Sequence, residues 1–187
     1  MRIIAGKLKR RTVRTISSQD VRPTTDRVRQ TLFDILAARI DFENLYVLNL
    51  FAGSGILGIE ALSRGAAFCT FVEHLPEAAR AIQQSLAAFS LSAQAKVWRI
   101  DAMHFLDKTT EQYDLIFADP PYKFSAHHRL LEKIFSRNLL REGGYLVLEH
   151  HRSQQFAMHR EFELQKTFGT TVLSFFSPND KPAPAAH

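Results

Sequence analysis

The stretch Leu48-Asn49-Leu50-Phe51-Ala52-Gly53-Ser54-Gly55-Ile56-Leu57-Gly58 decides how the rest of the chain is interpreted. Its apolar first half is typical of a buried strand. Its glycines let the backbone turn sharply and approach a ligand closely before a helix begins. Gly53, Gly55 and Gly58 also fit the spacing G-x-G-x-x-G, which occurs in dinucleotide-binding folds. The stretch therefore predicts a strand, a ligand-binding turn and a helix, but it does not identify the ligand.

The sequence around this stretch predicts an α/β fold. From residue 45 onward, short apolar runs alternate with amphipathic segments, which is typical of a parallel sheet wound with helices. Two β-rich runs near the end, separated by Gly169 and Thr170, predict a C-terminal antiparallel hairpin. The predicted strands are 46–51, 68–73, 96–100, 113–118, 145–149, 162–168 and 171–176. The predicted helices are 25–38, capped by Thr24 or Thr25, then 56–63, 77–89, 102–106 and 126–139, the last ended by Gly143 and Gly144.

Length and composition favour one main domain. The chain has 187 residues and is 45% hydrophobic, enough for one well-buried core. No apolar run approaches the roughly 20 residues of a membrane span, and the first residues lack the apolar stretch of a secretory signal. We therefore expect a cytoplasmic protein that does not bind membranes. We also expect it to be a monomer. Residues 1–40 are predicted to form a basic N-terminal extension of a hairpin (2–5 with 12–16) and a helix, residues 41–177 the wound domain, and residues 178–187 a disordered tail.

Positive charge is concentrated at the beginning of the chain. Residues 1–30 contain nine Lys or Arg and two Asp, a net charge of +7, whereas the remaining residues carry −2. A solvated charged face is the simpler explanation, but a basic arm on a mildly acidic body also suits a polyanionic partner such as RNA. The predicted RNA-binding residues are Arg2, Lys7, Lys9, Arg10, Arg11, Arg22, Arg27 and Arg29.

Acidic residues follow three of the predicted strands, at Glu73, Asp101 and Asp119. The carboxyl ends of parallel strands form the ligand-binding edge of a doubly wound sheet, so we expect these carboxylates to converge there. A dinucleotide would bring an anionic pyrophosphate, whereas S-adenosylmethionine brings a sulfonium cation, an ammonium group and a ribose diol. The acids thus favour S-adenosylmethionine, with Glu73 on the ribose hydroxyls and Asp101 on the adenine amine, although each could instead cap a helix or turn. The predicted cofactor-binding residues are Asn49, Phe51, Gly53, Ser54, Gly55, Glu73, Asp101, Ala102 and Asp119.

The tetrapeptide Asp119-Pro120-Pro121-Tyr122 is the predicted reaction centre. Two consecutive prolines fix φ and remove two N–H donors, so the loop is stiff and rich in acceptors. The Asp119 carboxylate and the Pro120 carbonyl can hold both N–H bonds of an exocyclic base amine and direct its lone pair toward a methyl group. Tyr122 offers a ring on which an extruded base can stack. An ordinary turn is the alternative interpretation of the same residues.

No metal site or covalent nucleophile is predicted. The doublets His127-His128 and His150-His151 place adjacent side chains on opposite faces of a strand, and no Cys or acid completes a usual ligand spacing. The single cysteine, Cys69, lies in an apolar run and is interpreted as a small buried side chain.

Six motifs follow one another in a fixed order along the chain. They are Arg2-Ile3-Ile4-Ala5-Gly6, Arg22-Pro23-Thr24-Thr25-Asp26-Arg27-Val28-Arg29, Leu32-Phe33, Leu50-Phe51-Ala52-Gly53-Ser54-Gly55, Glu60-Ala61-Leu62-Ser63-Arg64-Gly65-Ala66 and Asp119-Pro120-Pro121-Tyr122. This ordered set resembles the RsmD-type methyltransferase family, which modifies guanine N2 in bacterial 16S ribosomal RNA. The resemblance implies a Rossmann-like class I methyltransferase fold with a mostly parallel seven-stranded sheet. It also implies a 16S guanine in a small ribosomal subunit or its assembly intermediate as the target.

Two departures and two alternatives accompany this resemblance. Asn49 stands where the family usually has Asp, and Ser85 where Asn is common. A DNA adenine-N6 methyltransferase would use the same loop for another exocyclic amine. A non-catalytic RNA-binding assembly factor would retain the fold without turnover, and Asn49 is the feature that favours it.

Overall fold

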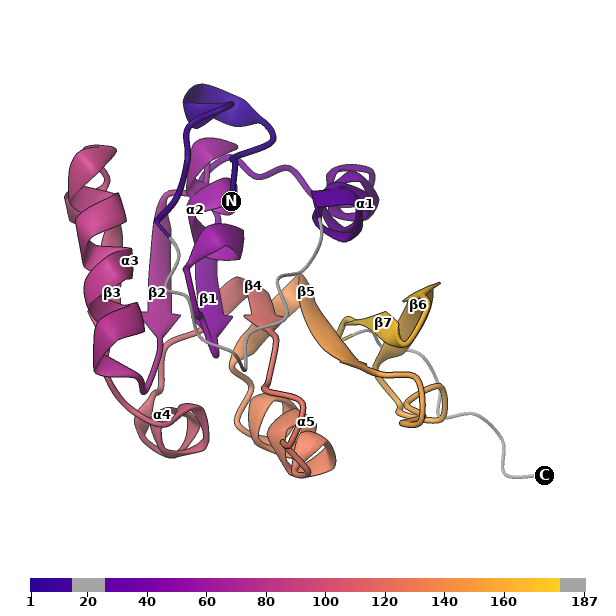
Figure 1. The fold of residues 1–187 in the computed structure, drawn as a ribbon. Coiled ribbons are helices and arrows are strands. Elements are labelled where there is room, and N and C mark those ends of the chain that lie inside the picture. Colours follow the sequence, from indigo (N-terminus) through magenta and orange to yellow (C-terminus); the bar gives the residue numbers. More distant parts are fainter. Residues whose placement is uncertain (15–25, 179–187) are drawn as a thin grey trace.

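The computed structural model describes residues 1–14 and 26–178, which form a seven-stranded sheet in the order β3-β2-β1-β4-β5-β7-β6 (Figure 1). The strands are β1 (Tyr46–Leu50), β2 (Phe68–Val72), β3 (Ala95–Trp98), β4 (Tyr113–Ala118), β5 (Leu140–His151), β6 (Phe162–Phe168) and β7 (Thr171–Phe176). The helices are α1 (Asp26–Ala37), α2 (Ile56–Ser63), α3 (Pro76–Ala88), α4 (Ala102–Lys108) and α5 (His127–Ser136), with short 3-10 helices η1 (Gly6–Leu8) and η2 (Ser92–Gln94).

Helices cover both faces of the sheet. One apolar cluster joins α1, α2 and α3 to one face through residues such as Phe33, Ile59 and Ile82. A second cluster joins α4 and α5 to the opposite face, where Leu106 and Ile134 are fully buried. β1 to β5 are parallel, whereas β7 pairs antiparallel with both β5 and β6. The predicted α/β sheet with its C-terminal hairpin is therefore confirmed.

The strand order places a crevice beside β1. The chain winds from β1 outward through β2 to β3 and then crosses back to β4 on the other side of β1. β1 and β4 end side by side, because Leu50 is paired with Ala118. Such a reversal of the winding direction opens a crevice at the carboxyl ends of the strands.

The predicted end of the last helix is wrong, and the fifth strand begins at Leu140 rather than at residue 145. Gly143 and Gly144 do not end a helix, because α5 stops at Ser136 and both glycines lie inside β5. A Cβ atom on Gly144 would lie 2.6 Å from the backbone oxygen of Asp114 in β4, where the β4–β5 register shifts. The glycine pair therefore marks a close approach of two strands at a bulge.

The described part of the basic N-terminal segment folds back on itself, but less extensively than the predicted pairing of residues 2–5 with 12–16. Arg2 and Thr12 form an antiparallel bridge, and Ile3 exchanges backbone hydrogen bonds with Arg10 and Arg11. The segment is not separate from the wound domain, because Ile3, Leu8 and Val13 belong to the same apolar cluster as α1, α2 and α3. Residues 15–16 of the predicted hairpin and the predicted helix caps Thr24 and Thr25 lie outside the described residues, as does nearly all of the predicted tail.

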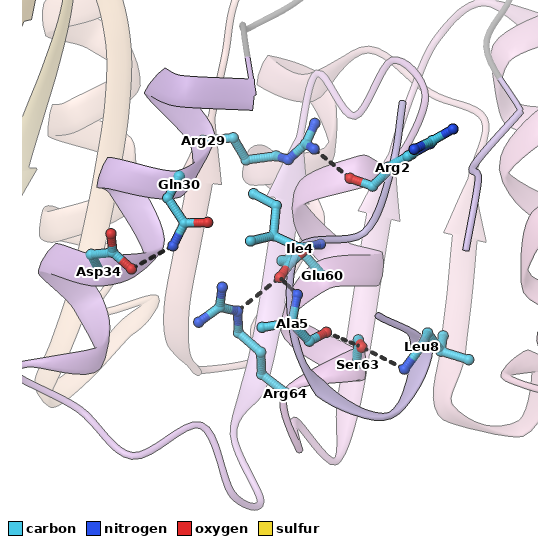
Figure 2. A network of polar contacts seen from close by, with 10 residues as sticks. All are labelled: Arg2, Ile4, Ala5, Leu8, Arg29, Gln30, Asp34, Glu60, Ser63 and Arg64. Carbon is cyan, nitrogen blue, oxygen red and sulfur yellow. Dashed lines mark hydrogen bonds and ion pairs between the residues drawn. The ribbon is translucent and has the colours of Figure 1, made fainter. Parts of the chain in front are cut away.

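Helix α2 anchors this segment through polar side chains (Figure 2). The buried Glu60 carboxylate accepts hydrogen bonds from the backbone N–H groups of Ile4 and Ala5, at 2.7 and 2.9 Å. Ser63 Oγ accepts from the Leu8 N–H at 2.9 Å and donates to the Ala5 carbonyl at 2.6 Å. Arg64 completes the network with an ion pair to Glu60 at 2.9 Å.

Among the described residues, no helix is both long enough and apolar enough to cross a membrane.

Gly6→Ala should destabilise the fold more than Gly169→Ala does. Both glycines have positive φ, at +77° and +61°, so an alanine is strained at either position. At Gly6, however, the added Cβ would lie 1.8 Å from the Ser63 carbonyl oxygen, whereas at Gly169 nothing lies within 4 Å. We expect an additional loss of about 1–3 kcal/mol in the free energy of unfolding by urea. Equal losses in the two variants would contradict the close packing of this segment on α2.

Candidate functional site

A cleft of about 270 Å³ lies at the carboxyl ends of β1, β2, β4 and β5. One side is formed by Asn49 and the loop Phe51–Ser54, together with Glu73 at the end of β2. The reaction loop, Asp119–Tyr122, forms the middle. Of the three carboxylates that the sequence predicted to converge at this edge, Glu73 and Asp119 line the cleft beside the glycine turn, whereas Asp101 does not.

Three predicted cofactor residues do not line this cleft. Gly55 is buried at the start of α2, and Asp101 and Ala102 lie at the start of α4. β3 ends at Trp98 rather than at residue 100, and the Asp101 carboxylate accepts from the His104 N–H at 2.9 Å as the cap of α4. The capping alternative is therefore realised at Asp101, and an adenine contact by this residue stays a prediction.

Glu73 fixes the glycine loop beside β2. Its carboxylate accepts the Gly53 N–H on one oxygen and the Leu75 N–H on the other, both at 2.8 Å. Only 5% of the residue is exposed. Oε1 also lies 3.3 Å from Nδ1 of His74, whereas Oε2 keeps a second acceptor position for a ligand hydroxyl.

Asn49 connects β1 to α2. Its side-chain oxygen accepts the Gly58 N–H at 3.2 Å, and only 2% of the residue is exposed. An aspartate could make the same bond, so the substitution retains the acceptor that holds the loop. It removes a charge and replaces one acceptor oxygen by a donor nitrogen, which lies 3.5 Å from the Leu50 carbonyl.

The reaction loop is held against the glycine loop. Pro120 is buried, and the Phe124 N–H donates to the Pro121 carbonyl at 2.8 Å, which closes the turn that follows. The rings of Phe51 and Phe124 meet edge to face with centroids 5.2 Å apart. Tyr122 is 84% exposed at the mouth of the cleft, where an incoming base can reach its ring.

The far wall of the cleft was missed by the sequence analysis. It includes His127 at the start of α5, Glu149, His150 and His151 at the end of β5, and Gln154 in the loop that follows. Glu149 ends a predicted strand, so the rule that identified Glu73 and Asp119 would have identified it too. The histidines were considered only as metal ligands, and nothing in the sequence singled out Gln154. Among the described residues, no group of His, Cys, Asp and Glu is arranged to hold a metal ion.

Burial favours the neutral form of two histidines of this wall, His127 and His150. Burial lowers the pKa of His127 to about 4, with further contributions from His150 and His128. Burial also lowers the pKa of His150, whose ring nitrogens lie 3.0 Å from the His151 carbonyl and 2.8 Å from Ser174 Oγ. The rings of His127 and His150 therefore add no positive charge to this wall at neutral pH.

The basic arm runs beside α3. Lys7 donates to Gln94 at 3.1 Å, Arg11 to the Ala88 carbonyl at 3.3 Å, and Arg14 to Gln84 at 3.2 Å. The same segment reaches the cleft, because Met1 lines it and is paired with Val13. Of the predicted RNA-binding residues, Arg2, Lys7, Lys9, Arg10, Arg11 and Arg27 are exposed, and Arg22 lies outside the described residues.

Arg29 is a correction to the predicted RNA surface. Its side chain is fully buried and donates to the Arg2 carbonyl (Figure 2). It also donates to the Asp26 carboxylate at 3.0 Å. A guanidinium held in this way connects α1 to the arm and is not available to phosphates, so its predicted RNA contact is wrong.

The lining of the cleft fits a cationic cofactor. Glu73, Asp119 and Glu149 bring three carboxyl groups to it, and no Lys or Arg occurs among its described lining residues. A pyrophosphate would face this acidic lining, whereas a sulfonium and an ammonium group are matched to it. The chemistry of the residues therefore agrees with S-adenosylmethionine and not with a dinucleotide.

Comparison with known proteins agrees with this geometry. A family model described as "Conserved hypothetical protein 95" matches residues 1–177. Ribosomal RNA small subunit methyltransferase D of Escherichia coli K12 is 39% identical over 149 residues, covering 80% of this chain and 71% of the relative. The solved structure of the hypothetical protein TTHA0928 of Thermus thermophilus has a TM-score of 0.82 at 28% identity, covering 95% of this chain and 99% of that one. A structure of an S-adenosylmethionine-dependent methyltransferase from Agrobacterium tumefaciens shares the fold, with a TM-score of 0.61 at 18% identity over 81% of this chain and 62% of that one.

Acidification from pH 7 to pH 5 should destabilise the wild-type protein more than the variant His127→Gln. The pKa of His127 falls from 6.5 to about 4 on folding, so below pH 6.5 protons bind preferentially to the unfolded chain. The contribution of neutral His127 to the free energy of unfolding is therefore complete above pH 6.5 and is lost as the pH falls. The loss amounts to about 2 kcal/mol at pH 5. Urea unfolding at both pH values measures it. The variant His128→Gln, at the exposed neighbouring position, is the control and should lose as much stability between pH 7 and pH 5 as the wild type. An equal loss in His127→Gln over the same pH range would contradict the assignment.

Proposed function

This chain belongs to the conserved hypothetical protein 95 family, and from that premise we propose that it methylates the exocyclic N2 amine of a guanine in 16S ribosomal RNA. Membership confirms the RsmD-type resemblance. The chain is an S-adenosylmethionine-dependent methyltransferase of ribosomal RNA, in agreement with its relatives and its fold. The choice of guanine, of its N2 atom and of a small subunit or its assembly intermediate as substrate is the finer part of the proposal.

The observation that most strongly supports the proposed methyl transfer is the position of Asp119 and Pro120. They follow β4 directly at the reversal of the winding, beside the glycine loop that Glu73 holds. A bound S-adenosylmethionine supplies an electrophilic methyl group at this place. The protein must then present an amine whose lone pair points along the line of transfer.

The residues of the reaction loop can prepare such an amine. Its lone pair is delocalised into the ring, which makes it a weak nucleophile. The Asp119 carboxylate and the Pro120 carbonyl accept hydrogen bonds from its two N–H groups. They thereby favour the geometry in which the nitrogen lone pair can attack the methyl group. Fixed acceptors of this kind lower the barrier without reorganising during the reaction. Tyr122 can stack on the base and set the orientation of its ring.

The position of the basic arm supports RNA as the molecule that carries the amine. Its exposed cations run along α3 and return toward the cleft, so a backbone bound there would be led to the reaction centre. The guanine target is supported by the family resemblance, and the proposal includes a cytoplasmic enzyme acting as a monomer.

Methyl transfer from labelled S-adenosylmethionine tests the proposal directly. The purified protein is incubated with small ribosomal subunits that lack the modification, with free 16S RNA and with duplex DNA. Mass spectrometry should locate the label on N2 of one guanine. Transfer to adenine N6 of the duplex would favour a DNA methyltransferase instead, and cofactor binding without any transfer would favour an assembly factor.

Asp119→Ala should lower the rate of methyl transfer by about a hundredfold or more, because one of the two fixed acceptors is removed. Circular dichroism should show an intact fold. Asp107→Ala, at an exposed position in α4, is the control and should retain the rate. Full activity of the Asp119 variant would place the reaction centre elsewhere.

Reversing two charges in the arm, with Arg10→Glu and Arg11→Glu, should weaken binding to 16S RNA by about tenfold or more at low salt and flatten its salt dependence. Cofactor affinity should be unchanged, since neither residue lines the cleft. Lys108→Glu with Arg129→Glu reverses two exposed charges on the opposite face of the sheet. An equal loss with this control pair would show a general effect of charge rather than a binding arm.

A further inference from the structure

Two buried polar atoms in the far wall of the cleft have no hydrogen-bond partner within the described part of the chain. They are Nδ1 of His127 and Oε1 of Gln154. Both residues line the cleft together with the reaction loop. Leaving buried polar groups unpaired is costly, so their presence in a ligand site points to a ligand that pairs with them.

The backbone at Gln154 is fixed relative to the reaction loop. Its N–H donates to the His151 carbonyl at 3.0 Å, and the intervening Arg152 N–H donates to Thr170 in the β6–β7 turn at 2.9 Å. The His151 ring in turn meets the Tyr122 ring edge-on, with centroids 5.8 Å apart. The backbone that carries the Gln154 carboxamide thus belongs to the same wall as the ring on which a base would stack.

His127 differs from its neighbour His150. Both nitrogens of His150 have protein partners, which makes that ring structural. His127 is 6% exposed and packed edge to face against Phe124, with ring centroids 5.0 Å apart. The first residue of α5 therefore presents a neutral imidazole, which has one donor and one acceptor nitrogen.

We propose that Gln154 and His127 are the residues that recognise guanine in this cleft. Gln154 Oε1 accepts a hydrogen bond from the guanine N1–H group, which lies next to the reactive amine. The His127 ring donates a hydrogen bond to the guanine O6 atom. The inference rests on the proposed function, because it takes the N2 amine to lie at Asp119 and Pro120.

The edge of guanine explains why these two groups are needed. Beside its N2 amine, guanine has the donor N1–H and the acceptor O6, whereas adenine has an acceptor at N1 beside its amine. A carboxamide oxygen that faces adenine N1 would form no hydrogen bond, because both atoms are acceptors. The pair thus favours guanine and disfavours adenine, since a site built to bond a group rejects analogues that lack it.

The test compares guanine with 2-aminopurine, which keeps the reactive amine but lacks both N1–H and O6. Small subunits are reconstituted with 16S RNA containing either base at the methylated position. Methyl transfer is then measured for the wild type and for Gln154→Ala and His127→Gln. The matched controls are Gln155→Ala and His128→Gln, whose parent residues are adjacent in sequence but do not line the cleft.

The wild type should prefer guanine over 2-aminopurine by at least about tenfold, and Gln154→Ala should lose most of that preference. His127→Gln should lose part of it, because its carboxamide can still donate to O6. Both controls should keep the wild-type ratio. Cofactor affinity should be the same in all variants.

Two results have different meanings. If the wild type methylates guanine N2 and the Gln154 and His127 variants keep its base preference, the recognition pair is refuted while the proposed function stands. If the wild type methylates no guanine in the reconstituted subunit, the proposed function itself fails and the recognition pair fails with it.

Discussion

The buried carboxylate of Glu60 is the interaction on which the arrangement of the molecule depends. It lies in α2, a helix of eight residues that are all buried, and it accepts the backbone N–H groups of the arm. The same helix begins at the glycine turn of the cofactor loop. Two turns of helix therefore fix the distance between the loop that faces the cofactor and the arm that carries the positive charge.

The two sides of the cleft are encoded differently. The side that we assign to the cofactor comes from neighbouring stretches. In these a strand end is followed directly by a residue with a proposed role, as at Glu73 and Asp119. The far side combines the start of α5, the end of β5 and the loop around Gln154. Local motifs thus specify the chemistry that many methyltransferases share, whereas tertiary packing assembles the surface that we assign to base recognition.

This difference explains what the sequence predicts and what it does not. Apolar runs and strand-end acids predicted the sheet, Glu73 and Asp119, because these features follow local periodicity. The glycine pair at 143–144 was misplaced, since glycine marks helix ends and strand bulges alike. Arg29 was assigned to RNA because charge alone does not reveal burial. His127 and Gln154 carried no motif, as their meaning depends on partners far away in the chain.

The way in which the arm is packed also limits how it can evolve. Ile3, Leu8 and Val13 belong to the main core, and the cations around them belong to the surface. The arm is therefore not a module that can be removed or exchanged as a unit, because losing it would open the core. Its outward side chains remain free to vary one at a time. Substrate preference can drift by surface substitution while the segment itself is retained.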